Sequence, residues 1–395
     1  MSTEKPIRVG IDGRVLMHYE MRGFARYTVE LFRAMKEVAG GSVELYSFSS
    51  GPIAPEFIRQ LEITPIVFPV HREMLWEQVD LPKQLRRHSI DIFHSTANRG
   101  LPYRRACKYV LTCHDVIDRL PEYSGREPWR GRWRKAYSDF VSRLSAHAYI
   151  TVSNFSKQDI CRLHSLRPDR VTVIYNAAHP RFYEILPEGK IAKVLNKYSL
   201  PRNYIFFLGG FDIRKNANTL VDAFAKLPQD APPLVLAGEH KWGFAAIAKK
   251  IKTLSLTQRI ACPGAIDDDD LPALYQGAIA LVNPSLYEGF GLQLVEAMAS
   301  GLPVLASETT SLPEVPDGAG LLFDPKDPTS IASAMERIYR DPTLRSTLAE
   351  KSRERAKFFS WQKAASQTLS LYYQLLSRAK SSADLDALAA PERRP

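Results

Sequence analysis

The sequence predicts an α/β protein made of two Rossmann-like, doubly wound domains in tandem. Its 395 residues are too many for one ordinary hydrophobic core, so two domains of about 150–200 residues are expected. Short apolar segments rich in β-forming residues alternate with helical patterns, first in residues 1–180 and again in residues 201–360. Such alternation is typical of βαβ units and therefore of parallel sheets.

The first domain is expected to span residues 1–180, and a polar, proline-bounded linker is expected at residues 181–200. Short apolar runs predict its strands, and longer periodic patterns predict its helices. The strands are expected at residues 7–11, 43–48, 92–94, 109–112, 149–152 and 171–175. The helices are expected at residues 24–38, 76–87, 132–144 and 156–163.

The second domain, residues 201–360, shows the same alternation without repeating the residues of the first. Its strands are expected at residues 204–208, 234–237, 260–262, 278–283, 303–306 and 320–323. Its helices are expected at residues 218–226, 244–252, 268–276, 293–299 and 328–339. Two more helices, at 342–358 and 361–376, precede a small, polar tail at 377–395 that we expect to be disordered.

Composition narrows the class of protein. The four cysteines have neither C-x-x-C spacing nor a histidine cluster, which favours free thiols in a reducing compartment over a zinc site or a disulfide framework. The chain shows no signal-peptide pattern and no run of 18 apolar residues, so neither a leader nor a transmembrane helix is expected. The net charge of +10 is concentrated in residues 1–180, which indicates an anionic partner: a lipid surface, a phosphorylated acceptor or nucleic acid.

The densest chemical pattern is PSLYEGFGLQLVEAMA at residues 284–299. An apolar strand leads into a turn with two glycines and then into a helix. We expect Gly289 and Gly291 to let the backbone approach a ligand closely. The first amides of the helix would then favour a diphosphate or sugar oxygens; they belong to Phe290, Gly291 and Leu292.

Two glutamates flank this turn. Glu288 stands before the helix and Glu296 about two turns inside it, so their backbones are expected about 12 Å apart. Each carboxylate can accept a pair of hydroxyl hydrogen bonds, which suits sugar recognition. The alternative is a helix with two incidental surface glutamates. The stretch resembles the E-x7-E motif of the retaining glycosyltransferases of family 4, as do the flanking segments at 278–306 and 312–325.

This resemblance covers nearly the whole chain and implies the GT-B fold. The two Rossmann-like domains would then face each other across a cleft, and the helix at 361–376 would cross back to the first domain. The second domain would bind a nucleotide-sugar donor and the first domain the acceptor. The resemblance also implies transfer with retention of anomeric configuration, without a metal or another cofactor.

A glycine pair and a basic pair form the second pattern. Gly209 and Gly210 end a strand, and Arg214 and Lys215 follow just before a helix. A guanidinium fork and an ammonium charge suit a diphosphate. In the family a basic pair at this place neutralises the leaving nucleoside diphosphate, so both residues are assigned catalytic roles. Some members carry an additional Arg where this chain has Gly210, which puts one phosphate contact in doubt; the alternative is a solvated Arg-Lys turn.

Two motifs of the first domain complete the expected site. Gly23 and Arg26 belong to a G-x-x-R-Y sequence, which in the family forms a loop over the diphosphate and the acceptor. His114 ends a strand, where ligands bind in open sheets, and in the family it faces the donor sugar. His114 and Glu288 complete the catalytic set with the basic pair. We assign His114 to positioning the sugar, because the donor phosphate can itself take the acceptor proton. The alternative is a purely structural histidine.

Two further features lie in the second domain. Glu239 ends a strand near the expected place of the nucleobase, and Trp242 is expected either to stack on that base or to pack within the fold. The acidic run at 267–270 precedes a helix, so we attribute it to capping and the helix dipole rather than to a metal site.

The resemblance implies transfer of a hexose to a lipid-linked or oligosaccharide acceptor in bacterial polysaccharide biosynthesis. GDP-mannose is the preferred donor, because the G-x-x-R-Y and R-K-N patterns resemble mannosyltransferases that build surface polysaccharide or O-antigen on polyprenyl diphosphate. A UDP-sugar or dTDP-sugar is the alternative. A non-catalytic nucleotide-sugar-binding module and a basic nucleic-acid-binding protein also stay open, although no nucleic-acid-binding motif accompanies the basic residues.

A membrane contact is suggested by residues 126–135, REPWRGRWRK. Arginine, lysine and tryptophan mixed in this way suit the headgroup region of an anionic membrane. A loop that grips a phosphorylated acceptor and a plain solvated loop are the alternatives. The protein is therefore expected in the cytoplasm, at the inner face of the plasma membrane.

Overall fold

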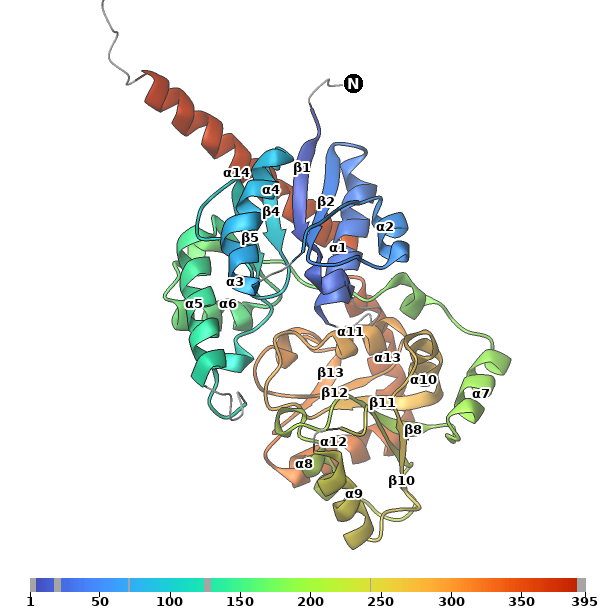
Figure 1. Cartoon of the computed structure of the whole chain (residues 1–395). Coiled ribbons are helices and arrows are strands. Elements are labelled where there is room, and N and C mark those ends of the chain that lie inside the picture. Colours follow the sequence, from blue (N-terminus) through green and yellow to red (C-terminus); the bar gives the residue numbers. More distant parts are fainter. Residues whose placement is uncertain (1–4, 18–22, 70–71, 124–128, 242, 389–395) are drawn as a thin grey trace, which may run out of the picture.

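The protein consists of two α/β units, each built on one parallel sheet (Figure 1). The computed structural model describes residues 5–17, 23–69, 72–123, 129–241 and 243–388. The first sheet lies within residues 7–173 and the second within residues 204–323. The expected architecture of two Rossmann-like domains is therefore confirmed.

The first sheet has seven strands in the order β3-β2-β1-β4-β5-β6-β7. They are β1 (Ile7–Asp12), β2 (Val43–Ser49), β3 (Thr64–Val67), β4 (Ile92–Ser95), β5 (Lys108–Thr112), β6 (Ala148–Thr151) and β7 (Val171–Val173). The helices are α1 (Phe24–Ala39), α2 (Pro55–Leu61), α3 (Glu73–Leu75), α4 (Leu81–Arg87), α5 (Trp129–Ser145) and α6 (Asn154–His164). A π-helical turn, η2 (Trp76–Asp80), joins α3 to α4.

The second sheet has six strands in the order β10-β9-β8-β11-β12-β13. They are β8 (Tyr204–Leu208), β9 (Leu234–Ala237), β10 (Ile260–Gly264), β11 (Ala278–Asn283), β12 (Val304–Ser307) and β13 (Gly320–Phe323). The helices are α7 (Glu188–Lys197), α8 (Ala217–Ala225), α9 (Phe244–Thr253), α10 (Leu271–Gly277), α11 (Leu292–Ala299), α12 (Pro328–Arg340) and α13 (Pro342–Ala356). Both sheets reverse their strand order at a central pair, β1/β4 and β8/β11, and such switch points are where open sheets bind ligands.

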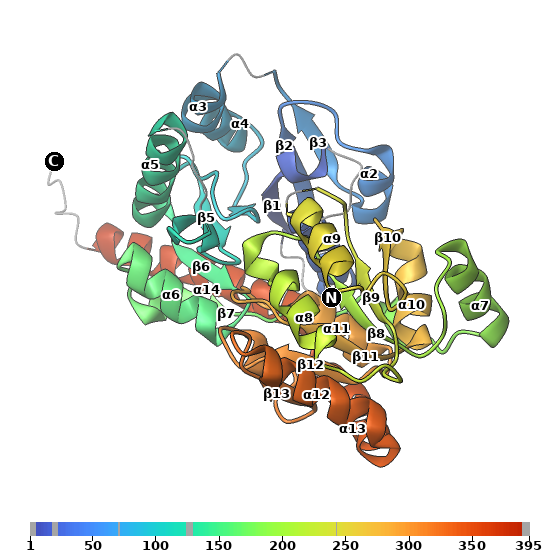
Figure 2. The same ribbon diagram turned by 90° about the horizontal axis from the view of Figure 1, so that it is seen from below.

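Helices cover both faces of each sheet (Figure 2). On the first sheet, α1 and the last helix, α14 (Trp361–Leu388), bury one face, while α4 and α6 bury the other. On the second sheet, α8 and α12 cover one face, and α10 and α11 the other. One hydrophobic cluster continues from the first domain into the second through Tyr27, Trp361, Phe290, Tyr275 and Phe182. The two domains therefore share apolar packing beside the cleft.

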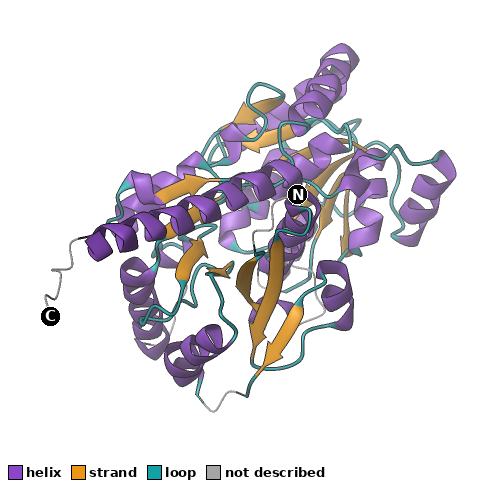
Figure 3. Cartoon of the chain, turned by 90° about the horizontal axis from the view of Figure 1, so that it is seen from above, coloured by secondary structure: helices purple, strands orange, loops and turns teal. Residues whose placement is uncertain are grey.

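The last helix, α14 (Trp361–Leu388), crosses back onto the first domain, as expected (Figure 3). Trp361 lies edge-on to Tyr27 of α1, with ring centroids 5.9 Å apart. Farther along the helix, the Tyr372 hydroxyl lies 2.6 Å from Nδ1 of the buried His94. The helix continues to Leu388, beyond the end expected at residue 376, and residues 389–395 lie outside the described part.

Several elements differ from the expectations. The sequence did not predict the edge strand β3, which contains Pro65, nor the short helix α2. The helix expected at 76–87 is divided into η2 and α4, and α3 precedes it. The linker expected at 181–200 contains α7, which packs against α10. In the described part of the chain, no helix combines the length and the apolarity needed to cross a bilayer.

Candidate active site

A cavity of about 540 Å³ lies between the two domains. In the first domain, its walls come from the N-terminus of α1 and from the loop that follows β5. In the second domain, they come from the loops that follow β8, β9 and β11. Most of the predicted site residues line it: Gly23, Arg26, His114, Gly209, Gly210, Glu239, Glu288, Gly289, Phe290, Gly291, Leu292 and Glu296. The chain thus brings residues from two distant segments to one cleft.

Glu288 is the centre of a buried polar cluster. Its carboxylate accepts hydrogen bonds from Lys215 Nζ at 2.5 Å and from Arg214 Nη1 at 3.0 Å. Ser285 Oγ donates a third bond at 2.8 Å. Burial alone would raise the pKa of Glu288, but the charges of Lys215 and Arg214 outweigh it and the net pKa is lowered. Glu288 is therefore ionised at neutral pH and is held in one orientation.

The predicted phosphate clamp stands behind this carboxylate. Arg214 and Lys215 are not among the described residues that line the cavity, because both side chains turn toward Glu288. Lys215 is buried, whereas Arg214 is partly exposed. Arg214 also lies 3.6 Å from Oδ1 of Asp212, so two carboxylates, Glu288 and Asp212, face the two cations of this cluster.

Glu296 is the second buried carboxylate of the motif. Arg26 Nη1 donates to one of its oxygens at 2.9 Å, and the Tyr275 hydroxyl donates to the other at 3.1 Å. Burial raises the pKa of Glu296, and the opposing charge of Arg26 does not fully offset this effect. The same guanidinium also pairs with Asp268. Arg26 was expected over a diphosphate, but in the structure it bridges the domains to Glu296 and Asp268.

His114 faces the second domain across the cleft, from the end of β5 in the first domain. Its Nε2 lies 3.0 Å from the carbonyl oxygen of Thr96, which can only accept a hydrogen bond, so the proton sits on Nε2. Burial lowers the pKa of His114 to about 4, and the ring is therefore neutral at neutral pH. The rings of Phe24 and Tyr27 flank it at 5.0 and 4.6 Å. Nδ1 is left as an acceptor suited to a hydroxyl.

The glycine turn docks the second domain on the first. The Gly289 carbonyl accepts hydrogen bonds from Ser153 Oγ at 2.7 Å and Ser156 Oγ at 3.0 Å. A Cβ added at Gly289 would lie 2.5 Å from the carbonyl oxygen of His114. The close approach that this glycine permits is thus to the backbone of the other domain. Gly291 differs, because it caps α11 with φ at 98°, in the left-handed region that favours glycine.

Of the remaining predicted features, Glu239 lies at the cavity, whereas the acidic run at 267–270 forms ion pairs with neighbouring segments. Glu239 lines the cavity and pairs with Lys241 at 2.6 Å, and Trp242 lies outside the described residues. The acidic run at 267–270 makes no side-chain cap, so the expected capping is wrong, although its residues lie in the turn that leads into α10. Its carboxylates pair instead with basic residues of neighbouring segments, namely Arg26, Arg181 and Lys197. Among the described residues, no three His, Cys, Asp or Glu side chains are placed to hold a metal ion.

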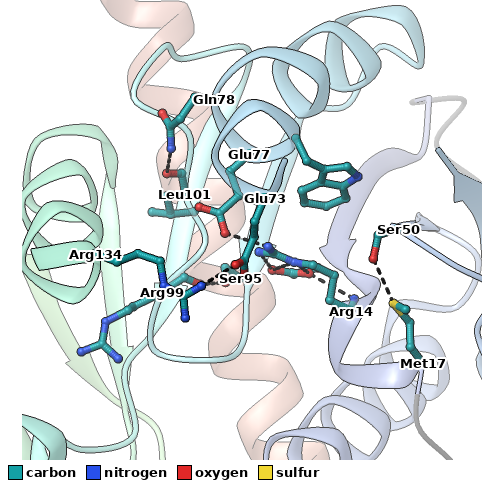
Figure 4. Close-up of polar contacts among 12 residues, drawn as sticks. Arg14, Met17, Ser50, Glu73, Glu77, Gln78, Ser95, Arg99, Leu101 and Arg134 are labelled. Atoms are coloured by element: carbon teal, nitrogen blue, oxygen red, sulfur yellow. Dashed lines mark hydrogen bonds and ion pairs between the residues drawn. The ribbon is translucent and has the colours of Figure 1, made fainter. Parts of the chain in front are cut away.

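A second polar cluster supports the first-domain wall near the end of β1 (Figure 4). Arg14 pairs with Asp12 at 2.6 Å and with Glu77 at 2.7 Å, and its guanidinium lies 4.6 Å from the centre of the Trp76 ring. The cluster fixes the π-helical turn η2 against the first strand. Sequence reasoning missed it, because Glu77 lies 63 residues from Arg14 in the sequence.

Sequence reasoning also missed groups that hold the motif in place. Ser285 and Tyr275 bind the two glutamates, and Ser153 and Ser156 bind the turn between them. Ser285 carried a signal, since it lies three residues before Glu288 in the same turn. Tyr275 and the two serines come from other elements, so only the fold brings them to the motif.

Comparisons with known proteins match both halves of the chain. The profile described as "Glycosyltransferase Family 4" matches residues 21–182, and "Glycosyl transferases group 1" matches residues 191–355. The chain is 34% identical over 293 residues to "O-antigen chain mannosyltransferase B" of Escherichia coli, covering 73% of this chain and 75% of that protein. It is 32% identical over 288 residues to "Serotype-specific mannosyltransferase WbdA" of the same organism, covering 71% of this chain but only 35% of that protein.

Solved structures give the same fold. The structure of Anabaena Alr3699/HepE in complex with UDP and glucose superimposes with a TM-score of 0.72. The alignment covers 93% of this chain and 100% of that chain at 18% sequence identity. A likeness at this identity concerns the fold, and it shows the two-domain arrangement with a cleft in between.

Proposed function

The chain belongs to glycosyltransferase family 4, and on this basis we propose that it transfers mannose from GDP-mannose to a saccharide acceptor with retention of configuration. The observation that carries the proposal is Glu288, held ionised by Lys215 and Arg214 across the cleft from His114. The mannosyl donor is supported by the names of the two Escherichia coli relatives, both of which are called mannosyltransferases.

The second domain is proposed to hold the donor nucleotide. Glu296 would accept the ribose hydroxyls, which requires Arg26 to share or release that carboxylate. The first turn of α11 presents amides that have no acceptor within the helix, and its first residue, Leu292, lines the cavity. These amides suit the diphosphate. The nucleobase would lie beside Glu239, at the end of β9.

Departure of the diphosphate is proposed to be driven by electrostatics. Lys215 and Arg214 stand within hydrogen-bond distance of Glu288, so their positive charge is fixed before the reaction begins. Preorganised charge of this kind stabilises a developing anion without reorganisation. These cations would supply what a divalent ion supplies in other transferases, so we propose catalysis without a metal or another cofactor.

His114 is proposed to position the transferred sugar rather than to act as a strong base. With a pKa lowered to about 4 by burial, the ring is a poor proton acceptor, and its Nε2 proton is already directed at Thr96. Nδ1 can accept one sugar hydroxyl hydrogen bond. The acceptor proton would then pass to the departing donor phosphate, on the same face as the bond that breaks, which accounts for retention.

The acceptor is proposed to be a growing polysaccharide, either free or linked to a polyprenyl diphosphate carrier. The names of the relatives, which refer to O-antigen chain and serotype, support this substrate class. A lipid-linked acceptor would place the enzyme at the cytoplasmic face of the membrane. The four cysteines are free thiols in the structure, in keeping with a reducing compartment.

Donor binding tests the proposal. Calorimetry with GDP-mannose, UDP-glucose, UDP-GlcNAc and dTDP-rhamnose, in the presence of EDTA, should give tight binding of GDP-mannose. The Glu296→Ala and Arg214→Ala variants should weaken that binding, while Glu336→Ala, at an exposed pair on α12, serves as the control. Binding of a UDP-sugar or dTDP-sugar instead would replace the donor, and binding that depends on added metal would contradict the metal-free cleft.

A further inference from the structure

Helix α5 carries an exposed apolar ridge outside the cleft. Trp129, Trp133, Phe140 and Leu144 are 73%, 58%, 54% and 40% exposed. At about 100° per residue, these four side chains fall within about 60° of the helix circumference. They lie opposite the face that buries Val141, Ser142 and Ser145, and we name these four residues the α5 ridge.

Positive charge flanks the α5 ridge. The helix holds five basic residues, namely Arg130, Arg132, Arg134, Lys135 and Arg143. Its single acidic residue, Asp139, is buried and pairs with Arg99 at 3.0 Å and with Arg119. Every exposed charge on α5 is therefore positive, although the helix packs on a domain that contains many carboxylates.

A neighbouring element extends the apolar surface. Arg134 Nη1 pairs with Glu73 Oε2 at 2.5 Å, which joins α5 to α3 (Figure 4). Beside Glu73, the side chains of Met74, Leu75 and Val79 are 41%, 49% and 40% exposed. Exposed apolar side chains therefore lie on both of these ion-paired elements, although the second also exposes the carboxylates of Glu73 and Asp80. Exposed apolar patches mark interaction sites.

The patch lies close to the cleft. The ring of Tyr123 lies 6.0 Å from that of Tyr287, which precedes Glu288. Trp129 follows Tyr123 by six positions in the sequence, so the two backbones are at most about 20 Å apart. If the α5 ridge binds to a surface, a molecule anchored in that same surface would therefore lie near the mouth of the active site.

We propose that the α5 ridge docks on the surface of an anionic lipid bilayer. Trp, Phe and Leu side chains would enter the boundary between headgroups and acyl chains, and the flanking arginines would pair with lipid phosphates. A bilayer fits better than a protein partner, because the exposed charges of α5 have one sign and the whole chain carries a net charge of +10. The proposed docking on a bilayer does not depend on the proposed function. Only its purpose, which is to bring a lipid-linked acceptor to the active site, rests on that function.

Vesicle sedimentation with the full chain tests this surface. The protein should bind vesicles that contain phosphatidylglycerol and should not bind vesicles made only of phosphatidylcholine. The double variant Trp129→Ala/Trp133→Ala should bind at least tenfold more weakly, and Arg132→Ala about fivefold more weakly. The matched control is Ile185→Ala, which removes an 88% exposed apolar side chain far from α5 and should bind as the wild type does.

Several results would overturn the proposal. Equal binding to neutral vesicles, or no binding to either kind, would contradict an anionic lipid surface. Binding of a soluble phosphorylated oligosaccharide that is weakened by Arg132→Ala, without vesicle binding, would assign α5 to gripping the acceptor instead. In a transfer assay the double Trp variant should keep its rate on a short soluble acceptor and lose rate on an acceptor embedded in vesicles. Absence of transfer by the wild type would refute the proposed function, while vesicle binding would still decide the docking surface.

Discussion

Replacement of Gly289 by alanine should disturb the contact between the two domains without disturbing the folding of either one. The added Cβ would lie 2.5 Å from the carbonyl oxygen of His114 and 3.0 Å from Cβ of Asp115. Real Cβ contacts stay above about 3.0 Å, so the domains must separate by roughly 0.5 Å or more at this point. Overpacking of this kind costs about 1–3 kcal/mol, which corresponds to a decrease of about 5- to 150-fold in the closed arrangement.

The assay is kcat/KM for donor turnover, together with thermal unfolding of the same samples. We expect Gly289→Ala to lower kcat/KM by about 5- to 150-fold, with little change in Tm because the clash can be relieved by separating the domains. Gly189→Ala, in the exposed helix α7 with open space around it, is the control. Wild-type kcat/KM in Gly289→Ala would refute the close contact between Gly289 and His114.

Three further perturbations follow from the site. Glu296→Gln should weaken nucleotide binding by about 10- to 100-fold in calorimetry, since it removes charge-assisted hydrogen bonds; unchanged affinity would remove Glu296 from the donor site. Burial lowers the pKa of His114 from 6.5 to about 4, so the stabilising effect of the neutral ring is complete above pH 6.5 and declines toward pH 4. The pH profile of kcat/KM should accordingly show no ionisation of His114 between about pH 5 and 8, and a limb that disappears in His114→Ala would contradict this. Tyr372→Phe should lower the free energy of unfolding in urea by about 1–3 kcal/mol, because it leaves Nδ1 of the buried His94 without its partner at 2.6 Å; unchanged stability would show that this hydrogen bond does not stabilise the packing of α14 on the first domain.

The sequence predicted the parallel sheets well, because their strands are buried on both faces and appear as short, continuous apolar runs. The edge strand β3 escaped prediction, since Pro65 removes a backbone donor that a central strand would need. Helix α7 escaped because it lies between prolines in a segment of weak pattern, although it buries Ile191 and Leu195. The π-helical turn within 73–87 depends on the pairing of Glu77 with Arg14, which no local pattern reveals.

The site was predictable where its residues lie in one short motif. Glu288, Gly289 and Gly291 were found together because the spacing itself carries the chemistry. The side chains that bind this motif could not be predicted, since Arg26 contacts Glu296 from a position 270 residues earlier in the sequence. The role of Gly289 also changed, because a glycine that permits close approach does not indicate whether a ligand or another part of the chain approaches.

The most direct test of the account is the anomeric configuration of the product. The protein would be incubated with GDP-α-mannose carrying ¹³C at the anomeric carbon, an oligosaccharide acceptor and EDTA, and the product would be examined by NMR. A retaining, metal-independent transferase should form an α-mannosyl product in EDTA at the rate seen without it. A β-mannosyl product, or transfer that appears only when a divalent metal is restored, would contradict retention by the charge cluster around Glu288.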